Sequence, residues 1–322
     1  MKNIQLEKAF SRRQEGLLKL RESGTNCYRL FSKGYDGEVP VSFDVFGDVI
    51  ILNYYEGEYS ASVEEFRPWA KLALELTQSQ SVYLKSALKD RSQERANNPM
   101  YDLKPWMGVA SQESVEVSEN GVKYLIRPYD GYQVGLFMDQ RENRRTLARA
   151  AKGKRVLNLF AYTGAFSVAC AMAGAEAVTS VDVSKKVLKW ADANFALNGL
   201  EKFPHQRRPD DAVSFLKRAA RRSERYGLII IDPPSFSRSD SGVFSVEKDW
   251  KTLLKSAVAV LEPGGTLFFS SNFRGWEQED AVDIMYQWAE SMSFDAEDGS
   301  VPFDFNLGEP GYPLLSVFLR KS

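Results

Sequence analysis

The stretch LIIIDPPSFS, residues 228–237, carries an acid, two prolines and an aromatic side chain at the end of an apolar run. A buried strand does not continue through consecutive prolines, because each lacks a backbone N–H and has a fixed φ. The turn is therefore rigid, and it presents Asp232 and Phe236 close together. A stiff, flat wall beside a carboxylate suits a nucleobase taken out of its stack. The alternative is a structural turn in which Phe236 is a buried cap.

Two more acids and a glycine follow neighbouring candidate strands. Residues 156–167, VLNLFAYTGAFS, place Gly164 at a turn into a helix, and Asp182 and Asp211 follow the next two candidate strands. In an open α/β sheet, ligands bind at the carboxyl ends of the strands. We therefore expect Asp182, Asp211 and Asp232 to line one edge of a sheet.

The number of glycines in the turn indicates which cofactor it binds. A dinucleotide pyrophosphate needs several glycines in close approach, but here Gly164 lies in the turn and Gly174 well beyond it. One glycine with an acid on the next strand fits a nucleoside that has no pyrophosphate. Asp182 can accept hydrogen bonds from both ribose hydroxyls, and Asp211 can accept one from an adenine amino group beside the amide of Ala212. These positions predict S-adenosylmethionine as the cofactor.

The composition argues against several other chemistries. The single histidine, His205, gives no basis for a His-ligated metal or a Ser-His-Asp triad, and we expect it at a surface or strand edge. Cys27 and Cys170 lie far apart, which excludes a disulfide framework or thiolate zinc cluster and suits a reducing cytosol. No apolar run approaches the roughly 18 residues of a membrane span, and the start lacks a signal-peptide core. We predict a cytoplasmic protein without a metal or a membrane partner.

Charge is unevenly distributed, although the formal net charge is only −1. Residues 141–155 and 217–225 are rich in Lys and Arg, whereas residues 276–318 contain many acids and no Lys or Arg. This asymmetry is typical of a protein with one phosphate-facing side. Solvated helix faces that differ in sign would give the same pattern.

The order of apolar periods predicts two regions. Residues 5–22 and 60–79 indicate helices, residues 25–57 a short antiparallel meander, and residues 113–129 a hairpin around Asn120-Gly121. From about residue 154, strands and helices alternate, which favours a parallel, doubly wound α/β sheet. We place an α+β accessory domain in residues 1–110, and an α/β domain with a leading hairpin in residues 111–322.

Four long motifs carry a family resemblance: residues 131–144, GYQVGLFMDQRENR; residues 156–175; residues 180–200, SVDVSKKVLKWADANFALNGL; and residues 228–237. They resemble the bacterial class I methyltransferases that act on large-subunit ribosomal RNA, which include the RlmI proteins and the RlmK half of the fused RlmKL enzyme. The resemblance covers roughly residues 120–275. It implies a Rossmann-like, seven-stranded sheet and a smaller N-terminal α+β domain that helps to grip RNA, with 23S rRNA as the partner.

The resemblance also implies a cofactor site that closes with the stretch around residue 140. The residues that match the motifs, or that neighbour those matches, are Asp139, Gln140, Arg141, Asn158, Phe160, Tyr162, Thr163, Gly164, Asp182, Ser184, Asp211, Ala212 and Asp232.

The atom that receives the methyl group is constrained by the missing nucleophile. Cytosine C5 enzymes normally add a cysteine thiolate to the base, but the segment after the next strand is FFSSNFRGW, residues 268–276. This segment resembles the RlmK pattern, whose product is 7-methylguanine. Guanine N7 has a free lone pair and loses no proton, so no general base is required. The resemblance therefore predicts a catalytic tip that contains Asp232, Pro233, Pro234, Phe236 and Asn272.

Base contacts are expected from Phe236, Asn272 and Arg274, although the last two are equally acceptable as plain turn residues. Three alternatives keep the cofactor and change the substrate: another rRNA base, including cytosine C5; a tRNA; or a small molecule. A further alternative, from another class, is a non-catalytic RNA-binding protein on the same scaffold. A monomer and a homodimer both fit the sequence.

Overall fold

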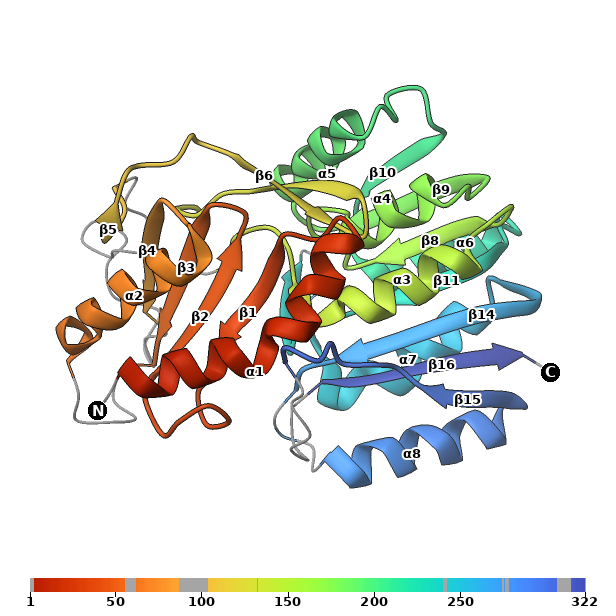
Figure 1. The fold of residues 1–322 in the computed structure, drawn as a ribbon. Helices are drawn as coiled ribbons and strands as arrows, with labels where there is room; N and C mark the ends of the chain where they lie inside the picture. Colours follow the sequence, from red (N-terminus) through yellow and green to blue (C-terminus); the bar gives the residue numbers. More distant parts are fainter. Residues whose placement is uncertain are drawn as a thin grey trace. The chain divides into compact units, whose positions relative to one another are not determined.

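The structure is a computed structural model. It describes residues 3–55, 62–86, 104–131, 133–239, 242–273, 275, 278–305 and 314–321. The chain forms two compact units, shown in Figure 1. The first contains residues 1–139 and 302–309, and the second contains residues 140–301 and 310–322.

The first unit is built on a five-stranded sheet with strands in chain order. Its strands are β1 (Cys27–Phe31), β2 (Val41–Phe46), β3 (Val49–Tyr54), β4 (Ser81–Ser86) and β5 (Met107–Gly108). Helix α1 (Asn3–Glu22), the 3-10 turn η1 (Val63–Phe66) and helix α2 (Arg67–Thr77) accompany the sheet, and β6 (Val115–Glu119) pairs with β7 (Val122–Ile126) as a hairpin. The predicted first helix, meander and Asn-Gly hairpin are therefore present.

The boundary between the units differs from the one expected near residue 110. Hairpin β6–β7 belongs to the first unit, where the amide of Asn26 donates to the carbonyl of Ser118 at 3.0 Å. The short segment 302–305 belongs there as well, because Asp304 is fully buried and its Oδ2 accepts from the amide of Arg29 at 2.8 Å. The chain thus returns to the first unit late, which local sequence patterns do not indicate.

The second unit contains a seven-stranded sheet in the order β10-β9-β8-β11-β14-β16-β15. The strands are β8 (Arg155–Leu159), β9 (Ala177–Asp182), β10 (His205–Pro209), β11 (Tyr226–Ile231), β14 (Leu261–Ser271), β15 (Phe294–Asp298) and β16 (Leu315–Lys321). Six strands run in the same direction, and β16 alone of the seven runs antiparallel to its neighbours β14 and β15. This is the predicted Rossmann-like sheet of seven strands.

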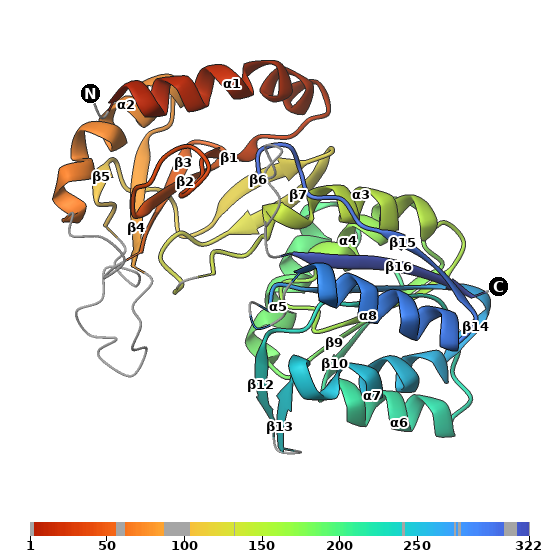
Figure 2. The ribbon, with the colours of Figure 1, turned by 90° about the horizontal axis from the view of Figure 1, so that it is seen from below.

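Helices cover both faces of this sheet. They are α3 (Arg141–Ala150), α4 (Ala165–Met172), α5 (Lys185–Leu197), α6 (Ala212–Arg221), α7 (Val246–Val258) and α8 (Gln278–Ser291). Figure 2 shows α3 and α4 on one face and α6, α7 and α8 on the other. The apolar strand of residues 228–231 is consequently buried on both sides, as its continuous hydrophobic run predicts.

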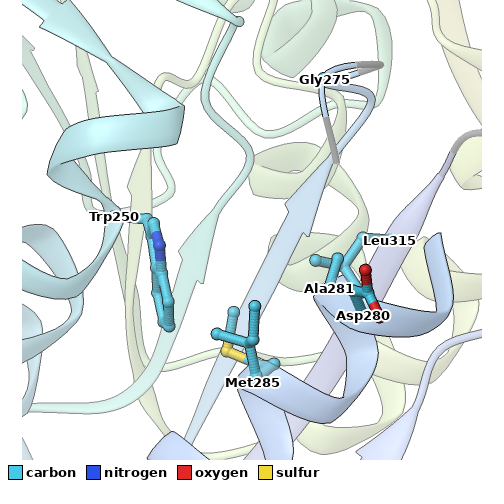
Figure 3. Close-up of a pocket in the computed structure, with 7 residues that line it drawn as sticks. Trp250, Gly275, Asp280, Ala281, Met285 and Leu315 are labelled. Atoms are coloured by element: carbon cyan, nitrogen blue, oxygen red, sulfur yellow. The ribbon is translucent and has the colours of Figure 1, made fainter. Parts of the chain in front are cut away.

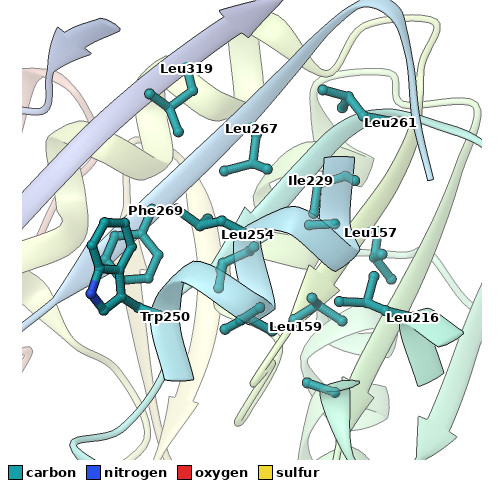
Figure 4. Packing of buried hydrophobic residues seen from close by; sticks show 14 of the residues in the cluster. Leu157, Leu159, Leu216, Ile229, Trp250, Leu254, Leu261, Leu267, Phe269 and Leu319 are labelled. Atoms are coloured by element: carbon teal, nitrogen blue, oxygen red, sulfur yellow. The ribbon is translucent and has the colours of Figure 1, made fainter. Parts of the chain in front are cut away.

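The hydrophobic core on the α6–α7–α8 face of the sheet helps to keep the neighbouring strands in register. Leu159, Ile231 and Phe269 are fully buried on three neighbouring strands and belong to one cluster with Leu254 of α7. Figure 4 shows Leu159, Phe269 and Leu254 in this cluster. Truncating such a side chain to alanine costs about 2–5 kcal/mol in comparable cores. This packing therefore keeps the carboxyl ends of the strands, and the residues that follow them, aligned along one edge of the sheet.

Candidate active site

The strand register brings the predicted acids to one edge of the sheet. Leu159 pairs with Val181 on one side and with Ile231 on the other. Asp182 and Asp232 are the next residues on the outer two of these three strands. Because adjacent strands lie about 4.8 Å apart, the two acids are about 10 Å apart along the same edge, on either side of β8.

The loop that follows β8 has an unusual backbone. Phe160 and Tyr162 have φ values of 56° and 49°, in the left-handed region that costs a residue with a side chain about 1–2 kcal/mol. Gly164 has φ 74°, and a Cβ on it would lie 2.8 Å from the Cβ of Ala191. Strained residues of this kind cluster at ligand sites, where the surrounding structure holds them in place. The turn therefore requires glycine at 164, as the sequence pattern suggested.

Asp182 is one of the groups that hold this loop. Its Oδ2 accepts from the amide of Tyr162 at 2.9 Å, and its Oδ1 accepts from the amide of Ser184 at 2.9 Å. An ionised carboxylate offers about four lone-pair positions, so these two amides occupy only part of its capacity. Burial raises the pKa of Asp182, and the two amides oppose that rise. The carboxylate therefore keeps acceptor capacity for a ligand with paired hydroxyl donors.

Thr163 is held from the other side. Its carbonyl accepts from Nδ2 of Asn194 on α5 at 2.9 Å, and the Thr163 side chain is fully buried. Ser184 caps α5 by accepting from the amide of Val187 at 3.4 Å. Helix α5 and strand β9 together therefore fix the loop, and Asn194 is a positioning residue that the sequence analysis missed.

Asp211 lies at the start of α6, where it accepts from the amide of Ser214 at 2.8 Å. This is the N-cap contact that Asp commonly makes, so a structural role already accounts for the residue type. The amide of the preceding Asp210 donates to the carbonyl of Asp182 at 3.1 Å, which ties the tips of β9 and β10 together. Ala212 is the first residue of α6, at the same edge. Their contact with an adenine remains a prediction.

Asn158 lies inside the sheet rather than at its edge. Its side chain is buried, and Nδ2 donates to Oγ of Ser167 at 2.9 Å. The chain of hydrogen bonds continues from Ser167 to Ser180 at 2.7 Å and from Ser180 to Nε2 of His205 at 2.8 Å. His205 begins the edge strand β10 and stacks on Phe195 with ring centroids 3.9 Å apart. Asn158 thus belongs to a polar chain across three strands, and a cofactor contact from it is a prediction without structural support.

The stretch around residue 140 is held by hydrogen bonds to strands β14 and β16. Gln140 is buried, and its Nε2 donates to Oγ of Ser270 on β14 at 2.7 Å. Asn143 donates to Oε1 of Gln140 at 2.8 Å and to Oγ of Ser316 on β16 at 3.3 Å. Arg141 is buried at the start of α3, while Asp139 is the last residue before the boundary between the units. Asn143 is a second positioning residue that sequence reasoning missed.

The proline turn presents its aromatic residue to solvent. Pro233 is buried, but Phe236 is 61% exposed on a hairpin made of β12 (Phe236–Ser239) and β13 (Gly242–Ser245). Phe236 pairs with Ser245, so Phe244, one residue along, faces the opposite side. It is Phe244 that is buried, with its ring 5.3 Å from that of Phe160. The interpretation of Phe236 as a buried cap is therefore wrong.

A cavity of about 250 Å³ lies beside the tips of β14 and β16 (Figure 3). It is lined by Trp250, Gly275, Asp280, Ala281, Ile284, Met285 and Leu315. The exposed Asn272 follows β14 at this edge, whereas Arg274 lies outside the described residues. Across the described part of the chain, no group of three or more His, Cys, Asp and Glu side chains could hold a metal ion, and no helix is long and apolar enough to cross a membrane.

Sequence comparison identifies the family. A profile of the S-adenosylmethionine-dependent methyltransferases matches residues 76–302. The chain belongs to this family. It is 33% identical over 287 residues to ribosomal RNA large subunit methyltransferase K of Neisseria meningitidis, covering 88% of this chain and 78% of that protein. The predicted resemblance is confirmed.

Other relatives are longer or are known from structures. The chain is 32% identical to the K/L methyltransferase of Colwellia psychrerythraea but spans only 38% of that protein's length. A crystal structure of the methyltransferase SMU.776 in complex with SAH superposes with a TM-score of 0.82 and 28% identity, over 99% of this chain and 80% of that one. A methyltransferase from Agrobacterium tumefaciens gives 0.68 and 25%, over 93% and 90%. The fold and the enzyme class are thus those predicted.

Proposed function

We propose that this methyltransferase modifies a base of large-subunit ribosomal RNA, and that the base atom is guanine N7 in 23S rRNA. The observation that carries the proposal is the common edge formed by Asp182, the strained loop 160–164 and Asp232, next to the exposed ring of Phe236. The relatives named as large-subunit rRNA methyltransferases K support RNA as the substrate.

The residues at the edge fit S-adenosylmethionine. Asp182 has unused acceptor capacity for the two ribose hydroxyls, and its two amide contacts keep the carboxylate oriented for them. Gly164, at φ 74°, has no side chain, so the loop backbone at this residue can come close to a ligand. When bound, the cofactor supplies an electrophilic methyl group on a sulfonium.

The remaining cofactor contacts are assigned by position. Asp211 and the amide of Ala212 would meet the adenine, while Thr163 and Ser184 would support the loop and Asp182. Asp139, Gln140 and Arg141 would close over the cofactor, with Gln140 already fixed to the tip of β14 through Ser270.

The base would be received at the tip of β11. Phe236 offers an exposed ring for stacking, worth about 1–3 kcal/mol per base at comparable sites, and Pro234 beside it is exposed and rigid. Asp232 and Asn272 flank this surface at the ends of adjacent strands, where they would orient the base edge. Arg274, the third expected contact, is outside the described residues.

Methylation at N7 requires the protein mainly to position the base and the methyl donor. The N7 lone pair forms the new bond to the methyl carbon as the carbon–sulfur bond breaks, and no proton is transferred. Holding the two atoms in line supplies most of the catalytic effect. Methylation of cytosine C5 finds no nucleophile here, since Cys170 is buried in α4 with a pKa raised by burial to about 12, and Cys27 lies in β1.

The first unit would help to hold the RNA, and the protein would act in the cytoplasm.

A deletion strain provides the test of the whole proposal. Nucleosides of its 23S rRNA should lack one 7-methylguanosine that is present in the wild type, and the native gene should restore it where an Asp182→Ala variant does not. An unchanged level of 7-methylguanosine together with the loss of another methylated nucleoside would contradict the proposed target. No change in any rRNA nucleoside would contradict rRNA as the substrate.

A further inference from the structure

The cavity beside β14 and β16 is separate from the surface on which the target base would stack. Leu315 in its wall pairs with Ser271, which places the cavity at the same edge of the sheet as Asp232. Its lining comes from α7, α8, β16 and Gly275, however, and Phe236 does not line it. One strand spacing is about 4.8 Å, so the cavity is within reach of a nucleotide next to one held at β11.

The size and the lining of the cavity are compatible with a single nucleobase. Its volume of about 250 Å³ is slightly below the roughly 300–1,000 Å³ of pockets that hold drug-sized ligands. Figure 3 shows Trp250 projecting from α7 on one side, opposite Met285 of α8. Gly275 lies at the loop side, where a Cβ would overlap the ring of Phe273. Trp250 and Met285 are largely buried, so an entering base would make its apolar contact chiefly with Ile284, which is 44% exposed.

Asp280 is the single charged side chain in the lining. It is exposed, and among the described residues no hydrogen bond or ion pair is found for its carboxylate. As the third residue of α8 it also suits the helix N-terminus electrostatically, which is a structural reason for an acid there. The helix N-terminus explains why an acid is found at position 280, but it does not explain the apolar cavity beside Asp280.

A carboxylate beside an apolar cavity can select among the bases. Guanine presents two adjacent donors on its Watson–Crick edge, N1–H and the N2 amino group, whereas adenine and cytosine each present one amino group beside an acceptor. Two parallel hydrogen bonds to a carboxylate are a strong, geometrically specific arrangement. We propose that this cavity binds a guanine base of the RNA substrate, adjacent to the methylated nucleotide, and that Asp280 reads N1–H and N2–H. The proposal rests on the proposed RNA methylation and adds a sequence preference to it.

Nucleotide titrations of the full chain test the pocket without RNA or methyl donor. GMP, IMP and AMP would be titrated and followed by NMR saturation transfer. IMP lacks only the N2 amino group, so wild-type protein should bind GMP about tenfold more tightly than IMP, and AMP more weakly still. The Asp280→Asn variant should bind GMP and IMP alike. The exposed Asp283 on the same helix gives the matched control, and Asp283→Asn should keep the wild-type preference.

Two more variants distinguish GMP binding in this cavity from GMP binding at the proposed stacking surface of Phe236. Ile284→Arg places a cation four residues after Asp280 on α8, where it would pair with the carboxylate and fill the cavity, so GMP binding there should be lost. Phe236→Ala should leave the ratio of GMP to IMP affinity unchanged. A preference for GMP that survives Asp280→Asn, or that disappears with Phe236→Ala alone, would overturn the proposal, as would no GMP binding by the wild type. None of these outcomes depends on whether 7-methylguanosine is formed.

Discussion

The carboxylate of Asp182 accepts a hydrogen bond from the amide of Tyr162, with 2.9 Å between Oδ2 and N. Tyr162 is in the left-handed conformation, φ 49°, so the acid at the end of β9 holds the loop that follows the neighbouring strand β8 in a strained turn. The same carboxylate is the proposed ribose ligand. Cofactor binding and the shape of the loop are therefore coupled through one side chain.

Replacement of Asp182 should weaken cofactor binding. Asp182→Ala removes a charged acceptor, and we expect a loss of about 1.5–3 kcal/mol in the affinity for S-adenosylhomocysteine, measured by calorimetry. Asp192→Ala on α5 is the control, because Asp192 pairs with Arg207 at the surface and its loss should change affinity by less than about 0.5 kcal/mol. Equal affinities of the Asp182→Ala variant and the wild type would refute the ribose assignment.

The affinity for S-adenosylhomocysteine should also depend on pH. Burial raises the pKa of Asp182 above that of an ordinary aspartate, and the ionised form is the one that accepts from ribose. Affinity should therefore fall as the pH drops through this raised pKa. The ligand-free fold responds with the opposite sign, since a raised folded-state pKa makes the ionised form costly and protonation relieves that cost. Calorimetry from neutral pH to about pH 4.5 should show acid weakening in the wild type that is absent in Asp182→Ala.

Alanine substitutions at two glycines should distinguish the cost of backbone strain from the cost of steric overlap. Gly153 and Gly164 have φ values of 67° and 74°, but a Cβ on Gly153 meets nothing within 4 Å, whereas one on Gly164 lies 2.8 Å from Ala191. Gly153→Ala should cost about 1 kcal/mol of unfolding free energy from φ alone. Gly164→Ala should cost about 1–3 kcal/mol more, and should also weaken cofactor binding. Urea denaturation compares the two variants, and equal losses would contradict the close approach of the loop to α5.

The two aromatic residues of the β12–β13 hairpin should have different roles. Phe236→Ala should lower kcat/KM on RNA by about tenfold or more, through loss of base stacking, and leave the melting temperature nearly unchanged because the ring is exposed. Phe244→Ala should destabilise the protein by about 2–4 kcal/mol, because this ring is buried against Phe160. If thermal unfolding ranked the two variants in the reverse order, the assigned faces of the hairpin would be wrong.

The single histidine, His205, makes the stability of the second unit sensitive to acid. Burial lowers the pKa of His205 to about 4, with a further contribution from the charge of Arg207. The unfolded chain takes up this proton near pH 6.5, so stability is fully present above that pH and is lost as the pH falls towards 4. We expect a loss of about 1–3 kcal/mol between pH 7 and pH 4.5, measured by urea unfolding. His205→Gln should reduce this acid sensitivity, and an identical pH profile for the two proteins would contradict it.

Much of this edge was predictable because its signals are local. An apolar run that ends in an acid locates a strand tip, and successive strands of an alternating fold deliver their tips to one side, so Asp182 and Asp232 could be placed together. Gly164 could be identified for a similar reason, since the turn it occupies lies between a strand and a helix.

Contacts between distant segments could not be predicted in this way. Phe236 and Phe244 have similar local sequences, and only the hairpin register and the position of Phe160 decide which ring is buried. Asn158 is polar in an apolar strand, which invites a functional interpretation, but its partner Ser167 lies on the following helix and the chain continues to another strand. The return of residues 302–305 to the first unit depends on Asp304 and Arg29, which are far apart in the sequence.

The central claim is methyl transfer to guanine N7 at the edge that holds Asp182 and Asp232. The direct test incubates purified protein with methyl-labelled S-adenosylmethionine and 23S rRNA from the deletion strain, then separates the nucleosides by mass spectrometry. The account predicts label in 7-methylguanosine with the wild type and almost none with Asp182→Ala. Label in a different nucleoside would contradict the target atom, and undiminished transfer by Asp182→Ala would contradict the site.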